Sequence, residues 1–69
     1  MKYAYYVMDD QGRRSNIPTS LKHNARADAA RLNKRHKRHR VIFSLVFVEL
    51  TPENMRAVMA LPESPYIIL

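Results

Sequence analysis

Residues 34–50 read KRHKRHRVIFSLVFVEL and join a basic run to an apolar one. The basic run contains no acid, and the ten residues after it contain one, Glu49. Residues 41–50 predict a β-strand, because branched and aromatic side chains alternate between its two sides. Since both sides are apolar, we expect both to be covered and this strand to form the core of the sheet.

Residues 21–39 predict one long helix before this strand. The segment has no proline, glycine or β-branched residue and is rich in alanine. Helical spacing gathers its small and apolar side chains, together with two histidines, on one narrow stripe: Leu21, Ala25, Ala29, Leu32, His36 and, beside them, His39. We therefore expect the helix to pack on the strand through this stripe and to expose a broad cationic side.

Two shorter segments precede the helix. Residues 2–8 are aromatic and extended in character, and Gly12, the only glycine, supplies a turn after them. Residues 13–17 predict a short, polar edge strand, which Pro18 ends. Together these segments predict a hairpin.

The C-terminal segment adds a short helix and an apolar end. Thr51, Pro52 and Glu53 combine a cap, a proline at the first helical position and an acid in the first turn. Residues 65–69 are either a final edge strand or an apolar tail on the core. We therefore predict one α+β domain over residues 1–69: a small, mainly antiparallel sheet of ββαβ layout with one basic helix packed on it, a short C-terminal helix and an apolar tail.

Composition narrows the class of protein. A chain of 69 residues lies near the lower limit for folding alone, so we expect a homodimer or a stable complex. The absence of cysteine excludes disulfides and cysteine zinc sites. The longest apolar run is far shorter than the roughly 20 residues of a membrane span, and the N-terminus is unlike a secretory signal. We expect no membrane association and a cytoplasmic protein.

The positive charge is concentrated in one segment. The net charge is +6, and residues 22–40 hold eight of the 12 lysines and arginines against one acid, Asp28. Such a field attracts polyanions and acidic proteins. The candidate contacts lie on the exposed side of the predicted helix and in the basic run: Arg26, Arg31, Lys34, Arg35, Lys37, Arg38 and Arg40.

These cations predict a non-enzymatic binding module that presents a basic helix to DNA, RNA or a nucleoprotein through phosphate contacts. The alternative is an inhibitor or modulator that binds an acidic surface of a host protein. A third interpretation is a solvated helix end that only confers solubility.

The histidines and tyrosines are further candidates for a chemical role. His36 and His39 have the spacing of paired metal ligands, but no further ligand lies near and the cations would repel a metal ion. They also lack a nucleophile or carboxylate at workable spacing, so we expect no metal, no cofactor and no catalysis, only ring packing between helix and sheet. The tyrosines of residues 2–8 are expected to pack in the core, with base stacking as the alternative.

The C-terminal segment offers a secondary candidate surface for a protein partner. It consists of Met55, Met59 and Tyr66. Methionine side chains adapt to varied partners, although core filling by Met55 and Met59 is the alternative.

One resemblance adds to this interpretation. The chain has an aromatic MKY opening, a D-x-G turn ending at Gly12, an alanine-rich helix ending in Leu32-Asn33 and an apolar strand after it. In this pattern, residues 2–50 resemble small accessory proteins encoded by bacteriophages and prophages. The resemblance implies a protein that binds and modulates host factors and has no enzyme activity of its own.

Overall fold

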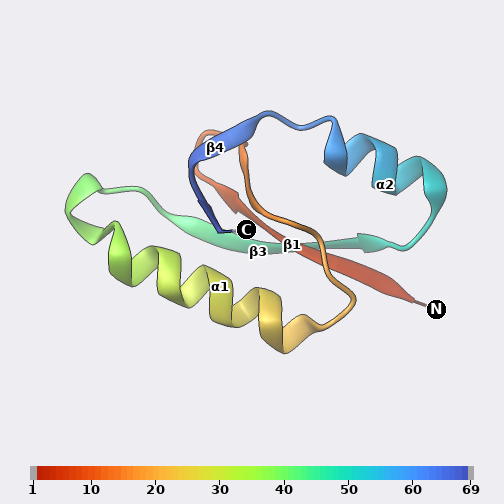
Figure 1. Ribbon diagram of the computed structural model, residues 1–69, viewed down its shortest axis with the longest axis horizontal. Coiled ribbons are helices and arrows are strands. Elements are labelled where there is room, and N and C mark those ends of the chain that lie inside the picture. Colours follow the sequence, from red (N-terminus) through yellow and green to blue (C-terminus); the bar gives the residue numbers. More distant parts are fainter. Residues whose placement is uncertain (1, 69) are drawn as a thin grey trace.

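The computed structural model describes residues 2–68, which form an α+β fold (Figure 1). The elements in chain order are β1 (Tyr3–Asp9), β2 (Arg14–Asn16), α1 (Lys22–Arg35), the 3-10 helix η1 (Lys37–His39), β3 (Phe43–Glu49), α2 (Pro52–Met59) and β4 (Glu63–Ile68). The predicted C-terminal helix is confirmed, and Thr51 caps it by accepting a hydrogen bond from the backbone N–H of Asn54 (3.1 Å). The apolar end forms an edge strand, although Leu69 lies outside the described residues.

The strands form one mixed sheet in the order β3-β1-β2-β4. β1 is antiparallel to β3 along its whole length, from Tyr3 opposite Glu49 to Asp9 opposite Phe43. β1 is also antiparallel to β2, whereas β4 is parallel to β2. The sequence predicted a mainly antiparallel sheet, without this parallel pair. The parallel pair arises because α2 and its connections form a crossover from β3 at one edge of the sheet to β4 at the other edge. Such a crossover lets β4 run in the same direction as β2.

The two helices lie on opposite faces of the sheet (Figure 1). α1 packs through Ala25, Ala29 and Leu32 against the face that contains Val7 and Phe43. On the other face, α2 and the sheet border a shallow cavity of about 140 Å³ lined by Tyr6, Val48, Asn54, Ala57, Val58 and Leu61. The small alanines allow α1 to approach its face closely.

The expectation that residues 41–50 form a fully covered core strand is wrong. β3 lies at an edge of the sheet, and Phe43 is its one fully buried residue. Phe47 is 61% exposed and Leu21 is 49% exposed, so neither belongs to the buried core, contrary to the prediction. Because α1 begins only at Lys22, Leu21 precedes the first turn of its stripe. The Phe47 half of β3 is therefore left open on the α1 face.

The polar strand β2 is central and buried, and not an exposed edge as predicted. It lies between β1 and β4, and Arg14, Ser15 and Asn16 are 3%, 0% and 1% exposed. The Asn16 side chain accepts a hydrogen bond from the backbone N–H of Val7 (2.7 Å) and donates one to Asp28 of α1 (3.2 Å). These bonds satisfy the buried side chain of Asn16 and tie the hairpin to α1, which helps a polar segment to lie inside the sheet.

Candidate functional site

The candidate site is the exposed side of α1 and the 3-10 helix that follows it. The predicted continuous helix over residues 21–39 is interrupted at His36, whose φ of −110° and ψ of 21° are not helical. The basic run continues through η1 to Arg40. Asn33 of α1 fixes this corner to β3, since its side chain donates to the Phe43 carbonyl (3.0 Å) and accepts from the Phe43 N–H (2.9 Å).

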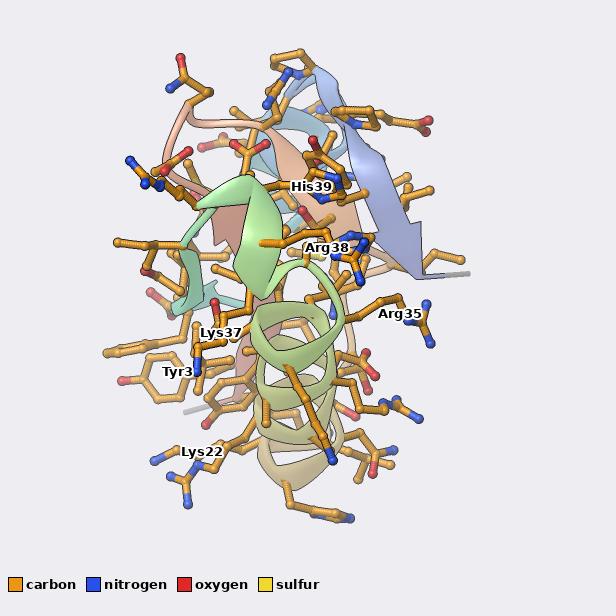
Figure 2. The ribbon with its side chains drawn as sticks, turned by 90° about the vertical axis from the view of Figure 1, so that its left-hand side faces the viewer. Tyr3, Lys22, Arg35, Lys37, Arg38 and His39 are labelled. Carbon is orange, nitrogen blue, oxygen red and sulfur yellow. The ribbon has the colours of Figure 1, made fainter. Side chains whose placement is uncertain are left out.

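The structure places all seven candidate cations on this one surface, and each is exposed. We call it the basic surface, and its residues are Arg26, Arg31, Lys34, Arg35, Lys37, Arg38 and Arg40. Figure 2 shows Arg35 and Lys37 projecting to different sides of the C-terminal end of α1, with Arg38 between them. The cations therefore spread around the exposed side of the helix.

Six of these seven cations have no acidic partner within residues 2–68. The ion pairs in this range are Arg13 with Asp9 (2.7 Å), Arg14 with Glu63 (3.6 Å) and Arg31 with Asp28. Asp28 also accepts the hydrogen bond from Asn16, so both of its carboxylate oxygens are engaged. The one acid of the basic segment is therefore held by the fold and by Arg31. It leaves the other six charges without neutralisation.

A cluster of rings borders the C-terminal end of the basic surface. The ring centroids of His36 and Tyr66 are 4.5 Å apart, and those of His39 and Tyr66 are 5.5 Å apart with an interplanar angle of 24°. Phe43 meets Tyr66 edge to face at 6.1 Å. The predicted ring packing between helix and sheet is thus confirmed for His36, whereas His39 packs on Tyr66 from η1 and stays exposed.

The secondary surface is divided by the sheet. Tyr66 packs with the core cluster on the α1 face, whereas Met55 and Met59 belong to α2 on the other face. The core-filling alternative also fails for Met59, which is 54% exposed, while Val58 is the buried residue of α2. A partner that contacts the two methionines would not reach Tyr66 on the same face.

The surroundings of His36 predict a pH dependence of stability. Desolvation, then the charges of His39 and Arg35, lower its pKa below the ordinary 6.5. Between the folded-state pKa and 6.5 the unfolded chain therefore binds more protons. The stabilising contribution of the neutral His36 ring is present above pH 6.5 and is lost as the pH falls through the folded-state pKa. We expect the melting temperature to decline in that window, and less so in His36→Gln.

A proton titration of the His36 ring by NMR should accordingly give a midpoint below 6.5, and a midpoint above 6.5 would contradict this environment. The titration of Asp9 does not overlap the pH range in which His36 changes the stability. Burial disfavours its charged form, but hydrogen bonds from the Arg13 backbone, Ser64, the Arg13 side chain and the Gln11 backbone outweigh this and lower its pKa below 3.8. Its contribution is lost only at more acidic pH.

Arg40 holds a left-handed backbone conformation, with φ of 57°. This conformation costs a non-glycine residue about 1–2 kcal/mol. Residues with such backbone strain cluster at functional sites. We predict that Arg40→Gly raises the free energy of unfolding by up to about 1 kcal/mol, part of the gain being offset by the freer unfolded chain. Denaturant titration measures this effect, and a destabilised variant would show that relief of strain does not outweigh the added freedom of the unfolded chain.

A second aromatic group lies at the other end of the sheet's α1 face. Phe47 contacts the rings of Tyr3 (5.7 Å, 85°) and Tyr5 (6.2 Å, 42°). Beside it is a pocket of about 460 Å³ lined by Lys2, Tyr3, Tyr5, Ser20 and Leu50. Core packing was expected for the tyrosines, and Phe47 was not recognised as a site residue. Its pairing with Tyr5 across the strands would have been the signal, but it depends on a register that the sequence does not specify.

Comparisons with known proteins identify no relative of this chain. Searches with protein-family models, among curated proteins and among solved structures gave no match to the chain. Within residues 2–68, no group of three or more potential ligands is arranged to hold a metal ion. In the same range, no helix is both long and apolar enough to cross a bilayer. The function is therefore argued from the charge and geometry of the basic surface.

Proposed function

We propose that this protein is a small, non-enzymatic module that binds nucleic acid through the basic surface. The observation that supports this most strongly is the absence, within residues 2–68, of an acidic partner for six of its seven cations. Cations that meet phosphates release the counterions condensed on a nucleic acid, and this release drives binding.

The composition of the surface favours phosphate over a general role in solubility. Soluble surfaces commonly intersperse charges of both signs, whereas one sign dominates this surface. Here the one acid of the basic segment is engaged by Arg31 and Asn16. Five of the seven cations are arginines, whose planar guanidinium groups bind phosphate oxygens in pairs. Contacts of this type orient the protein on the nucleic acid without specifying its sequence.

The surface is also long enough for several contacts. α1 has 14 residues, and a helix of that length extends about 21 Å. η1 and Arg40 continue the cationic surface beyond its end. A backbone that follows this surface would meet several cations in succession, so binding is expected to depend steeply on salt.

The competing partner is an acidic host protein, as the resemblance to phage accessory proteins implies. It would engage the same cations, so charge alone does not separate the two. The homodimer and the cytoplasmic location stay predictions. For the homodimer, the outer edge of β3 is available for pairing, with Ile42 64% exposed beside it. Sedimentation at micromolar concentration tests it.

Fluorescence anisotropy with labelled single-stranded and duplex oligonucleotides tests the proposed function. We expect binding to both at low salt. A pull-down from lysate, with and without nuclease, then identifies the natural partner. Loss of the partner after nuclease treatment supports nucleic acid. A nuclease-resistant complex combined with no oligonucleotide binding would replace the proposal with the acidic-protein alternative.

A further inference from the structure

We infer that Phe47, Tyr3 and Tyr5 form a stacking platform for the bases of a single-stranded nucleic acid. This inference rests on the proposed function, because the basic surface holds the phosphates and the platform selects the form of nucleic acid. We call these three residues the aromatic platform.

Phe47 is placed as a ligand-binding ring would be. Its side chain is 61% exposed, although it belongs to a strand. The rings of Tyr3 and Tyr5 contact it with centroids 5.7 and 6.2 Å away and limit its movement. An exposed phenylalanine leaves apolar area in water that a stacked ring would cover. Within residues 2–68 most of the Phe47 side chain is left uncovered, and the core cluster with α1 includes Phe43 of this strand instead.

A pocket next to the platform provides the space that a base needs. It has a volume of about 460 Å³, within the range of about 300–1,000 Å³ of small-molecule sites. Tyr3, Tyr5 and Leu50 give it aromatic and apolar walls, and Lys2 adds a cation. Thr19 forms two backbone hydrogen bonds with Tyr5 (2.7 and 2.9 Å), which fixes the adjacent Ser20 as a further wall.

The platform lies on the face of the sheet on which α1 packs, and α1 carries most of the basic surface on its exposed side. Side chains alternate along a strand, so Tyr5 faces the same way as Val7, against which α1 packs. α1 begins at Lys22, two residues after the pocket residue Ser20. Figure 2 shows Tyr3 and Lys22 on the same side of α1. A strand with bases on the platform can therefore extend its phosphates toward Lys22 and, one helical turn later, Arg26.

This juxtaposition favours a single strand over a duplex. Bases within a duplex are already stacked on their neighbours and present no free ring face to Phe47. Proteins that bind single strands combine a cationic track for the backbone with aromatic side chains on which successive bases stack. An acidic protein would match the cations, but it does not present planar rings at the regular spacing that a nucleic-acid strand gives to its bases and phosphates.

The experiment compares a short oligothymidylate with the duplex that it forms with oligoadenylate, using anisotropy at low salt. We expect the wild type to bind the single strand more tightly. Phe47→Ala should weaken single-strand binding by between about 5-fold and about 100-fold, the range for loss of one stacking ring, and leave duplex binding unchanged. Phe47→Trp should retain single-strand binding. The chain has no tryptophan, so quenching of wild-type tyrosine emission by the single strand reports stacking independently.

Ile42→Ala is the matched control, because Ile42 is 64% exposed and precedes the same strand. It should bind like the wild type. Equal binding of both nucleic acids, unaffected by Phe47→Ala, would overturn the inference and leave the proposed function standing. Binding of neither would overturn both. A lower sedimentation coefficient of Phe47→Ala with unchanged binding would show that the platform contacts a second copy, which also overturns the inference.

Discussion

Reversing Lys34, Lys37 and Arg38 to glutamate is expected to abolish nucleic-acid binding and leave the fold intact. All three side chains are exposed, and within residues 2–68 none has an acidic partner. Contacts to charged groups contribute about 1.5 kcal/mol or more each, so the loss of three raises the dissociation constant roughly 1,000-fold or more. Exposed substitutions change stability by only about 0.5 kcal/mol each.

Anisotropy measures the binding, and circular dichroism with thermal melting verifies the fold. Single reversals supply a matched pair: Lys34→Glu lies on the basic surface, and Arg56→Glu lies on the exposed part of α2 across the sheet. Both change the net charge equally, but only Lys34→Glu should weaken binding substantially. If the triple reversal binds as tightly as the wild type, the basic run is a solubilising helix end.

Phe43→Ala is expected to destabilise the fold by about 3–5 kcal/mol, the usual cost of removing a buried phenylalanine ring. Phe43 is 3% exposed and joins Val7, Ala29 and Leu32 in the core. It also meets Tyr66 edge to face. A domain of 69 residues has a free energy of unfolding of about 3–10 kcal/mol, so this one change can unfold it.

Phe47→Ala is the matched control, since it removes the same ring from the same strand at a position that is 61% exposed. It should cost about 1 kcal/mol or less. Leu45→Ala, within the predicted core strand of residues 41–50, should fall between the two because Leu45 is only half-buried. Denaturant unfolding measures all three. Equal losses for Phe43→Ala and Phe47→Ala would reject the burial pattern of β3.

The sequence predicted the elements whose signals are local. Three positions of the α1 stripe, Ala25, Ala29 and Leu32, are buried as expected from helical spacing alone. The start of α2 follows from Thr51 and Pro52, and both hold the predicted positions. The α+β class follows from the order of such elements, so it was predictable as well.

The order of the strands was not predictable, because it depends on contacts between distant residues. The sequence of β2 is typical of a polar edge strand. Hydrogen bonds of the Asn16 side chain with Val7 and Asp28 nevertheless stabilise it between two strands. β3 reads as a core strand, since apolar side chains do not reveal whether a neighbour will cover them. Its place at the edge follows from pairing β1 with β2 on the other side.

The same division holds for the candidate site. A run of cations is visible in any sequence, so all seven residues of the basic surface were named in advance. Their ion pairing was not visible, because the orientation of Asp28 toward Arg31 depends also on its hydrogen bond with Asn16, which is formed across the fold. The exposure of Phe47 was not visible either, because it depends on the position of β3 at the sheet edge and on which end of this strand joins the core.

Under the proposed function, the salt dependence of binding counts the phosphates that the basic surface contacts. The measurement compares the wild type with the Lys34→Gln, Lys37→Gln, Arg38→Gln triple variant on the same oligonucleotide over a range of salt concentrations. The logarithm of the wild-type binding constant should fall linearly with the logarithm of salt concentration. The triple variant should lose about two from this slope on a single strand and about three on a duplex. A slope equal to that of the wild type would contradict phosphate binding by these cations.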